Sequence, residues 1–586
     1  MAESMKGLHR SHRCTEVTKE MIGSEVTLMG WVQKRRNLGS LIFIDLRDRS
    51  GIVQILVDPE KIDIKDVRNE YVLQVYGKVA KKDVANKNLK TGEIEVIADR
   101  VNIINSAETT PMIIADETDA LEDTRLRYRY LDLRRPVLQK NLMVRAKIVQ
   151  AVHQYLDEHD FIEVETPILT LSTPEGARDY LVPSRVHPGH FYALPQSPQI
   201  FKQLLMVGGM ERYYQIARCF RDEDLRADRQ PDFTQIDIET SFLDQEQFLT
   251  LMEGCLANIF KKVRNIDLKL PLRRMEYDEA VDVYGSDKPD TRFGLHIQDV
   301  KKVFENTAFE GFKVKYIKAI VVPNVALETS RKQIDELQVM AKKFSLKGVT
   351  ALKVENGALV GSFIKYMKEE EHKALMETLK VNDNDLIIIA ASEDRHHACF
   401  GLGAIRSYYG KKLHLIPEHS FDLLWVVHWP MFEWDENEKR YVANHHPFTR
   451  PCDEDLPYLD TDPSKVYAYA YDIVINGYEA GGGSLRIYDR NVQQKIFEVI
   501  GLTDEDIERK FGFFIDAFRY GTPPHGGLAF GLDRLAMILN ETENIRDVIA
   551  FPKNLSAVCP MSKAPGTVDQ QQLDDLSIAI TKMEED

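Results

Sequence analysis

Residues 526–534 read Gly526-Gly-Leu-Ala-Phe-Gly-Leu-Asp-Arg534 and lead directly into the apolar segment Leu535-Ala-Met-Ile-Leu539. Glycines let a backbone approach a ligand closely, and an arginine at the start of a helix can hold a polyphosphate or lie over a base. The lysine and the serine or threonine of a P-loop are missing. A glycine-rich turn alone is weak evidence for nucleotide binding, so two further stretches decide its meaning.

The second stretch is Cys219-Phe-Arg-Asp-Glu223, followed eight residues later by Pro231-Asp-Phe-Thr-Gln-Ile-Asp-Ile-Glu239. A fixed arginine presents a planar fork of donors to a phosphate, and a carboxylate two residues further projects from the same face of a strand. Such a carboxylate suits a metal or an amine. Arg-x-Glu by itself is more often a surface ion pair.

The third stretch is Tyr471-Asp-Ile-Val-Ile-Asn-Gly-Tyr-Glu-Ala-Gly-Gly-Gly-Ser-Leu-Arg486. Asp472 and Glu479 interrupt apolar strand residues, a pairing suited to Mg²⁺ that carries phosphates. The triple glycine leaves room for a ligand beside Arg486, although a triple glycine is more often just a loop. Burying a charge in an apolar strand costs free energy unless the charge is paired or binds a metal, so these two acidic residues indicate a partner.

Together these stretches resemble the motifs of class II aminoacyl-tRNA synthetases. A helix with Val144, Ile148, Val152 and Leu156 on one face, followed by an extended segment that ends in Pro167, resembles motif 1. Residues 220–223 resemble motif 2 and residues 531–534 resemble motif 3. Further segments resemble the bacterial-type aspartyl-tRNA synthetases, namely residues 172–180, 196–205, 221–230 and 444–448.

The resemblance implies a two-step ligase that activates L-aspartate with ATP to aspartyl-adenylate and then transfers it to the 3′ end of tRNA(Asp). It implies ATP and Mg²⁺ as cofactors, and motif 1 implies a homodimer. The catalytic residues that it implies are Arg221, Glu479 and Arg534. Those implied to bind aspartate are Glu175, Ser197, Gln199, Lys202, Arg221, Gln235, Asp237, His445, His446 and Arg486. Those implied to bind ATP are Arg221, Asp222, Glu223, Gln230, Phe233, Glu479, Gly531, Leu532, Asp533 and Arg534, with Asp472 and Glu479 as Mg²⁺ ligands.

These roles fit the chemistry of the residue types. Arg221 is expected to hold the α-phosphate, where charge builds in the transition state, while Phe233 and Arg534 enclose the adenine. Lys202 and Arg486 are expected to pair with the side-chain carboxylate of aspartate, because neutral asparagine would leave them unpaired. One of the two histidines, charged or neutral, adds a donor. Purely structural roles are the alternatives: a Lys202 that extends along an apolar surface with its ammonium in water, and two histidines that only cap a turn.

Short strands are expected at 25–32, 41–46, 52–57, 71–79 and 92–97, which is typical of a five-stranded barrel of OB-fold size. Phe43 beside the basic run Lys34-Arg-Arg36 offers a stacking platform for unpaired bases, although a strand phenylalanine is usually core. The resemblance makes Arg36, Phe43 and Gln54 readers of the anticodon. Leu38 matches the residue of forms that charge only the aspartate tRNA.

The chain is therefore predicted to be a multidomain α+β protein with an OB-fold barrel, an antiparallel-sheet catalytic domain of class II type and an inserted α/β domain. The expected boundaries are 1–108 for the anticodon-binding barrel, 109–140 for a basic hinge or a solvated linker, 141–290 and 421–566 for the two catalytic parts, 291–420 for the insertion, and 567–586 for an acidic tail.

Composition limits the alternatives. The chain has 586 residues, 44% hydrophobic and 29% charged, with no stretch apolar enough to span a membrane. The N-terminus has no apolar signal segment, so the cytoplasm is expected. The six cysteines lie far apart without a CxxC pair, which indicates neither disulfides nor a zinc site. A net charge of −16 argues against indiscriminate nucleic-acid binding, but residues 1–50 carry +3 and residues 121–147 carry +5.

Three other functions remain as alternatives: aspartylation of both aspartate and asparagine tRNAs, a tRNA-independent asparagine synthetase on the same fold, and a non-catalytic nucleic-acid-binding protein. The barrel counts against the second, because such enzymes lack it. The intact Arg221, Glu479 and Arg534 count against the third.

Overall fold

The computed structural model describes residues 5–173, 177–223 and 228–581. The chain divides into two compact units. One unit comprises Met1–Val144, Leu225–Gln230 and Asn544–Thr567, and the other comprises Arg145–Asp224, Pro231–Glu543 and Val568–Asp586. Among the described residues, no helix is long and apolar enough to cross a membrane.

The first unit contains the expected five-stranded barrel. Its strands β1 (Glu25–Leu38), β2 (Leu41–Asp48), β3 (Gly51–Val57), β4 (Val72–Lys81) and β5 (Ile94–Asn105) close in the order β1-β2-β3-β5-β4. All pairs are antiparallel except β3 with β5. Alternate residues of each strand, such as Ile42, Ile44 and Leu46 of β2, fill the interior. The alternation of β-branched residues predicted these strands correctly, although β1 and β5 run further than expected.

The basic segment after the barrel forms helices α1 (Glu122–Arg127) and α2 (Arg129–Asp132) and the start of α3 (Pro136–Asp157). Arg129 is buried and donates hydrogen bonds to the carbonyl oxygens of Ala550, Arg546 and Ile549. Arg129 and Arg135 also pair with the buried Asp132. This part of the basic run therefore packs inside the unit, which contradicts the alternative of a solvated linker.

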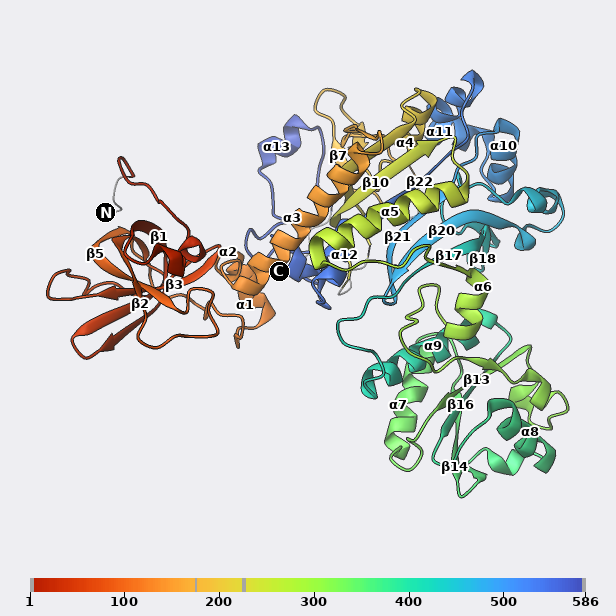
Figure 1. Ribbon diagram of the computed structural model, residues 1–586. Coiled ribbons are helices and arrows are strands. Elements are labelled where there is room, and N and C mark those ends of the chain that lie inside the picture. Colours follow the sequence, from red (N-terminus) through yellow and green to blue (C-terminus); the bar gives the residue numbers. More distant parts are fainter. Residues whose placement is uncertain (1–4, 174–176, 224–227, 582–586) are drawn as a thin grey trace. The chain divides into compact units, whose positions relative to one another are not determined.

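The second unit is built on an eight-stranded sheet in the order β11-β17-β20-β21-β22-β10-β9-β6 (Figure 1). The pairs inside the sheet are antiparallel, and only the outer pairs β11 with β17 and β6 with β9 are parallel. The strands are β6 (Ile162–Glu163), β9 (Arg212–Phe220), β10 (Asp232–Ser241), β11 (Arg273–Glu276), β17 (Leu423–Pro430), β20 (Tyr467–Ile475), β21 (Tyr478–Leu485) and β22 (His525–Gly531). This antiparallel sheet confirms the predicted fold class.

Helices cover the large sheet, and α5 runs across its strands in Figure 1. Helices α4 (Gln199–Val207), α5 (Gln245–Arg264), α12 (Leu532–Leu539) and the short α6 (Tyr277–Glu279) pack against its strands, and the unit also contains α10 (Arg490–Val499), α11 (Asp504–Ala517) and the short α13 (Gln570–Asp575). Two small hairpins, β7 (Leu181–Pro183) with β8 (Phe191–Ala193) and β18 (Phe432–Asp435) with β19 (Arg440–Ala443), complete this part. A 3₁₀ helix, η7 (Asp453–Asp460), follows the segment of His445 and His446.

A separate five-stranded sheet lies in the same unit, in the order β12-β13-β16-β14-β15. Its strands are β12 (Gln298–Asp299), β13 (Tyr316–Val322), β14 (Val349–Glu355), β15 (Ala358–Val360) and β16 (Leu386–Ser392). Helices α7 (Arg331–Lys342), α8 (Glu369–Leu379) and α9 (Arg395–Lys412) accompany it, and α7 begins at the side-chain cap of Ser330. The sequence boundary of 291–420 stays a prediction, as do the other domain boundaries.

Candidate active site

A cavity of about 260 Å³ lies over strands β10, β21 and β22 of the large sheet, next to α4 and the segment that follows β9. All nine described residues that were expected to bind aspartate line it, and Glu223 lines it as well. The nine are Ser197, Gln199, Lys202, Arg221, Gln235, Asp237, His445, His446 and Arg486. Glu175 lies outside the described residues. Sequence reasoning missed four further lining residues, which are Ala177, Gln196, Ser484 and Ala529, whereas Gly482 and Gly483 belong to the triple glycine that was expected to leave room for a ligand.

The glycines shape this cavity from within strands. The triple glycine 481–483 lies in β21, so the interpretation as a loop is wrong, and residues 526–531 lie in β22 instead of a turn. A Cβ at Gly482 would lie 2.5 Å from Asp472 Oδ1, and one at Gly527 would lie 1.9 Å from Glu239 Oε2. Glycine is needed at both positions because the space is taken by a buried carboxylate.

Lys202 lies at the bottom of the cavity between two carboxylates. Its side chain is only 2% exposed, and Nζ lies 2.7 Å from Asp237 Oδ1 and 3.3 Å from Glu239 Oε2. A snorkelling lysine would place its ammonium in water, so that alternative is wrong. Glu239 was not among the predicted site residues. It lies two positions after Asp237 in β10, and this spacing, which puts both side chains on one face of a strand, was the available signal.

Arg486 completes the charged network. Its Nε and Nη2 donate to the two oxygens of Glu239 at 2.9 and 3.1 Å, and its Nη1 donates to Ser484 Oγ and to His446 Nε2. A two-pronged arginine–carboxylate pair of this kind fixes the guanidinium rigidly. The contact to Arg486 also shows that His446 does more than cap a turn.

Burial sets the protonation states in the cavity. Burial raises the pKa of Asp237, whereas for Glu239 the nearby Arg486 and Lys202 outweigh burial and lower the pKa. Burial and Arg486 lower the pKa of His445 to about 4 and that of His446 well below its ordinary value. Both histidines are therefore neutral near pH 7, which decides between the charged and neutral donors left open by the sequence.

Two buried polar atoms in the cavity lack a hydrogen-bond partner among the described residues. They are Asp237 Oδ2, an acceptor, and Gln199 Nε2, a donor. The nearby hydroxyl of Tyr213 donates to Gln215 Oε1. Leaving such atoms unpaired costs about 1–3 kcal/mol each, so a cavity that contains them is suited to a ligand with both a donor and an acceptor.

The residues expected to bind the nucleotide lie partly at the cavity and partly in the surrounding framework. The Arg221 guanidinium lies over the Phe233 ring, 5.1 Å from its centroid. Arg534, near the start of α12, donates to the carbonyl oxygen of Glu479 at 2.7 Å. The Asp222 carboxylate pairs with the Arg178 side chain, and Asp222 N donates to the carbonyl oxygen of Arg178. These two contacts connect the segment after β9 to residue 178.

Four of the expected nucleotide residues make structural contacts instead of lining the cavity. The Asp533 carboxylate accepts from Thr234 N at 2.8 Å and pairs with Arg145. Leu532 is buried, and Gly531 ends β22 where α12 begins. Gln230 belongs to the other unit, where its side-chain amide forms two hydrogen bonds with the backbone of Lys553.

Asp472 and Glu479 form the carboxylate pair that the sequence assigned to Mg²⁺. Asp472 lies in β20 opposite Gly482, with His445 Nε2 at 4.0 Å. Burial, and after it the charge of Glu479, raises the pKa of Asp472 well above its ordinary value. This pair of carboxylates fits a divalent cation, since an oxygen-only donor set suits Mg²⁺.

On the barrel, Arg36, Phe43 and Gln54 lie on one outward face. Phe43 pairs with Arg36 across β1 and β2 and is half-buried outside the core, so the alternative of a core phenylalanine is wrong. Arg36 contacts Asp45 at 2.7 Å and Gln54 at 3.5 Å, and its Nε lacks a partner among the described residues. Leu38 is exposed at the end of β1.

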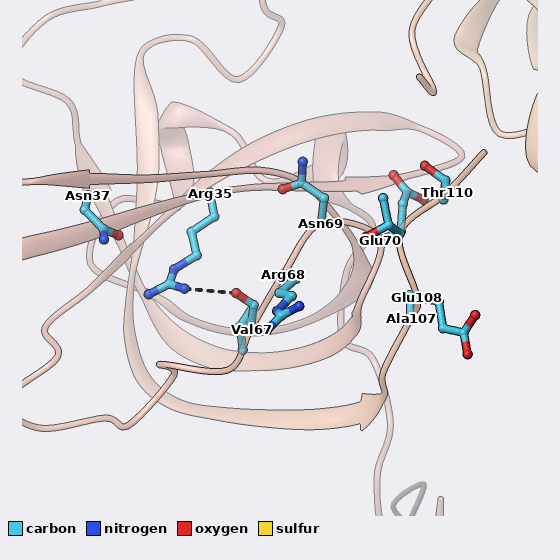
Figure 2. A pocket seen from close by; sticks show the side chains of 10 residues that line it. Arg35, Asn37, Val67, Arg68, Asn69, Glu70, Ala107, Glu108 and Thr110 are labelled. Carbon is cyan, nitrogen blue, oxygen red and sulfur yellow. Dashed lines mark hydrogen bonds between the residues drawn. The ribbon is translucent and has the colours of Figure 1, made fainter. Parts of the chain in front are cut away.

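Figure 2 shows a second hollow on the barrel unit, of about 570 Å³. Arg35, Asn37 and Asn69 line it, and Arg35 donates to the carbonyl oxygen of Val67 at 3.0 Å. The hollow therefore adds polar surface next to Arg36.

Comparison with known proteins was made for sequence and for structure. The family model of class II tRNA synthetases (D, K and N) matches residues 121–555, and that of the OB-fold nucleic acid binding domain matches residues 26–104. A protein from Geobacillus sp. (strain WCH70) named aspartate--tRNA(Asp/Asn) ligase is 54% identical and covers 97% of this chain and 98% of its own length. One from Geobacillus kaustophilus (strain HTA426) named aspartate--tRNA ligase is 54% identical, covering 98% of this chain and 99% of its own.

Similar solved structures support the fold. Asparaginyl-tRNA synthetase from Pyrococcus horikoshii complexed with asparaginyl-adenylate matches with a TM-score of 0.59 and 19% identity, over 93% of this chain and 98% of that chain. Aspartyl tRNA synthetase from Entamoeba histolytica matches with a TM-score of 0.58 and 18% identity, over 94% of this chain and 92% of that chain.

Proposed function

Since this chain belongs to the class II tRNA synthetases (D, K and N) and catalyses the ATP-dependent aspartylation of tRNA, we propose that the cavity over β10 and β21 binds and activates the aspartate. The observation that carries this assignment is the pair of buried cations, Lys202 and Arg486, beside the unpaired atoms Asp237 Oδ2 and Gln199 Nε2. An amino acid with a second carboxylate matches all four groups.

The side-chain carboxylate of aspartate lies between Lys202 and Arg486, and its α-ammonium donates to Asp237 Oδ2. The two cations are already held by Glu239, so they meet the substrate without reorganising. Ser197, Gln199 and Gln235 supply the remaining polar contacts. Asparagine would bring no negative charge to the two cations beyond that of Asp237 and Glu239, and this lost pairing is the proposed source of selectivity.

Activation forms a bond between an α-carboxylate oxygen of aspartate and the α-phosphorus of ATP, and it breaks the bond from that phosphorus to the pyrophosphate oxygen. Arg221 stabilises the charge that builds on the α-phosphate. Phe233 stacks on the adenine after Arg221 moves from the ring to the phosphate, and Arg534 covers the other face. In the second step a ribose hydroxyl of the terminal adenosine attacks the aspartyl carbonyl carbon, and AMP leaves.

Asp472 and Glu479 would hold Mg²⁺. The ion would supply positive charge to the phosphates of ATP. The chain's own contribution is the orientation of the two carboxylates, Asp472 by the space that Gly482 leaves and Glu479 by the register of β21.

The outward barrel face of Arg36, Phe43 and Gln54 is the proposed anticodon reader, supported by the unpaired Arg36 Nε and the position of Phe43 outside the core. Relatives of equal identity carry both the Asp and the Asp/Asn names. We propose that the enzyme aspartylates only tRNA(Asp), because Leu38 matches the residue of forms with this specificity. The alternative is aspartylation of both aspartate and asparagine tRNAs. Aminoacylation of separately purified aspartate and asparagine tRNAs distinguishes them: strict charging requires that only the first accepts aspartate.

A homodimer is proposed on the apolar surface that follows motif 1. Ile162, Ile168, Leu169 and Leu171 are each about half exposed, and β6 is the last strand of the sheet. Such a patch is suited to a second copy of the same surface. Light scattering on the purified chain should give twice the mass of 67.4 kDa. We also place the enzyme in the cytoplasm, where its tRNA and ATP are used in translation.

The decisive test of the cavity assignment is ATP–pyrophosphate exchange, which reports activation without tRNA. Arg221→Ala should reduce aspartate-dependent exchange by about a hundredfold or more, as expected for the loss of a group that contacts transition-state charge. Arg218→Ala, which removes an arginine of β9 that pairs with Asp232, is the matched control and should retain exchange. Normal exchange in Arg221→Ala would contradict the assignment.

A further inference from the structure

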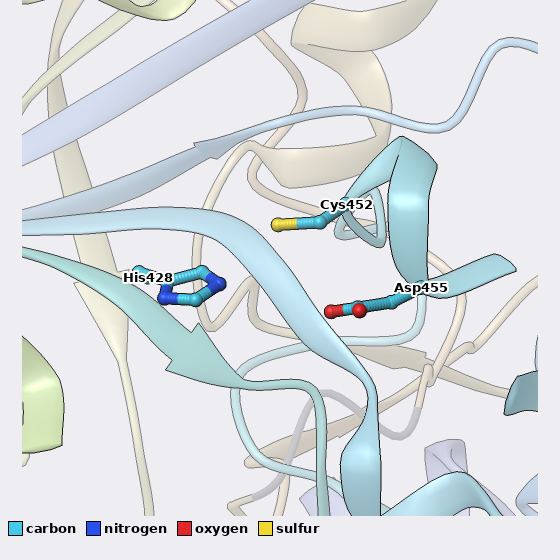
Figure 3. A group of neighbouring side chains, drawn as sticks. All are labelled: His428, Cys452 and Asp455. Carbon is cyan, nitrogen blue, oxygen red and sulfur yellow. The ribbon is translucent and has the colours of Figure 1, made fainter.

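Three side chains of different chemistry converge away from the aspartate cavity. His428 lies in β17, Cys452 directly precedes η7, and Asp455 lies within it. One nitrogen, one sulfur and one oxygen atom from these residues lie within 4.8 Å of one another. Figure 3 shows a ring nitrogen of His428 and a carboxylate oxygen of Asp455 directed toward the space that the Cys452 sulfur faces.

Neighbouring groups orient these side chains as the surroundings of a metal ion do. Glu276 Oε2 lies 2.9 Å from His428 Nδ1, which leaves Nε2 to face the cluster. A metal-binding histidine commonly donates its other ring N–H to a carboxylate in this way. Asp455 Oδ2 accepts from Tyr467 N at 2.9 Å, which leaves its other oxygen available.

The backbone also directs His428 toward the cluster. A bulge interrupts the pairing of β17 with β20 between Val427 and Trp429, and His428 there has a φ of 57°. A positive φ is uncommon for a residue that has a Cβ, although histidine is among the side chains that adopt it more often. The His428 ring stacks on Tyr467 with centroids 4.3 Å apart, which holds it in place.

The combination of donors decides which ion would fit. A thiolate, an imidazole and a carboxylate are ligands that Zn²⁺ accepts together, whereas Mg²⁺ and Ca²⁺ require oxygen. In a tetrahedral site with bonds of about 2.0–2.3 Å the ligand atoms lie roughly 3.3–3.8 Å apart. The cluster would have to close by about 1 Å, which side-chain rotation can provide.

We propose that His428, Cys452 and Asp455 form a binding site for one zinc-type divalent ion, with water as the fourth ligand. Cys452 is buried, and burial, together with the surrounding carboxylates led by Glu454, raises the pKa of its thiol to about 12. The same carboxylates attract a cation. The thiol proton passes to solvent as the sulfur–metal bond forms.

The site would clamp the segment that carries the two cavity histidines. Asn444 N donates to Met431 O at one end of this segment, and Cys452 N donates to Tyr467 O at the other. The bound ion would add a connection from Cys452 to β17. Trp429, next to His428, packs edge-on against His445 with centroids 4.9 Å apart.

Cobalt titration of the chelator-treated full chain, without ATP, tests the site directly. Co²⁺ bound by a thiolate gives a charge-transfer absorption band in the near ultraviolet, which the oxygen ligands Asp472 and Glu479 cannot give. We expect the band to saturate at one Co²⁺ per chain and to disappear on addition of Zn²⁺. Cys452→Ala should abolish it, and Cys255→Ala, which alters a buried cysteine of α5, should retain it.

Two further variants keep the test decisive if Cys452→Ala fails to fold. Asp455→Asn keeps an acceptor for Tyr467 N, and His428→Asn tolerates the left-handed backbone. Both should weaken Co²⁺ binding by about tenfold or more while their circular dichroism stays unchanged. The proposal is overturned if the wild-type chain gives no thiolate band, if the band persists in Cys452→Ala, or if both folded variants bind Co²⁺ as tightly as the wild type.

Discussion

Replacing Lys202 by methionine keeps the length of the side chain and removes the one ammonium group that contacts both Asp237 and Glu239. The three side chains are at most 2% exposed. Removing one partner of a buried ion pair costs about 3–5 kcal/mol of stability. The loss of stability should lie at the lower end of this range for two reasons. Glu239 keeps its ion pair with Arg486. Asp237 can take up a proton, because burial already raises its pKa.

The same variant should impair aspartate activation separately from stability. Loss of one charge-assisted contact to the substrate carboxylate costs about 3 kcal/mol, or about a hundredfold in kcat/KM for aspartate. The assay is ATP–pyrophosphate exchange with aspartate, accompanied by a thermal melt. Lys261→Met, at an exposed lysine of α5 paired with Asp267, is the control and should change neither.

A charge-matched double variant separates the two effects. Lys202→Met with Asp237→Asn removes one charge of each sign, so stability should recover by more than half while aspartate activation stays low. Aspartate activation at the wild-type level in the folded Lys202→Met variant would refute the role of this ammonium in binding the substrate.

Further predictions concern packing, pH and the barrel. Gly527→Ala places a Cβ 1.9 Å from Glu239 Oε2 and should lower the melting temperature and reduce aspartate activation, whereas Gly294→Ala, with nothing within 4 Å, should leave both unchanged. The pKa of His445 is lowered to about 4 from 6.5, so the unfolded chain binds more protons as the pH falls from 6.5 to 4. The free energy of unfolding should decrease over this window in denaturant titrations, and less steeply in His445→Gln. Phe43→Ala should raise the KM for tRNA roughly tenfold to a hundredfold by removing one stacked base, with ATP–pyrophosphate exchange unchanged; an unchanged KM would exclude the barrel face as the reader.

Local patterns in the sequence predicted those parts of the fold that depend on period and on residue chemistry. Alternation placed the barrel strands, because one face of each strand must be apolar. The cavity residues Lys202, Arg221 and Arg486 were assigned through the resemblance to class II synthetases, and the chemistry of their side chains agreed with those roles.

The roles of the strand glycines, of Glu239 and of the His428 cluster depend on contacts between residues that lie far apart in the sequence. Gly482 and Gly527 suggested turns, but they lie in strands where buried carboxylates occupy the space of a side chain. Glu239 escaped notice because its partners, Lys202 in α4 and Arg486 directly after β21, lie far from it in the sequence. The cluster of His428 and Cys452 combines separate segments, so a search for closely spaced cysteines could not reveal it.

The selection of aspartate by buried cations is the central claim, and ATP–pyrophosphate exchange by the wild-type enzyme tests it most directly. With aspartate and asparagine compared at equal concentrations, the arrangement of Lys202 and Arg486 predicts a kcat/KM for asparagine lower by about a thousandfold or more. Comparable exchange with the two amino acids would contradict it.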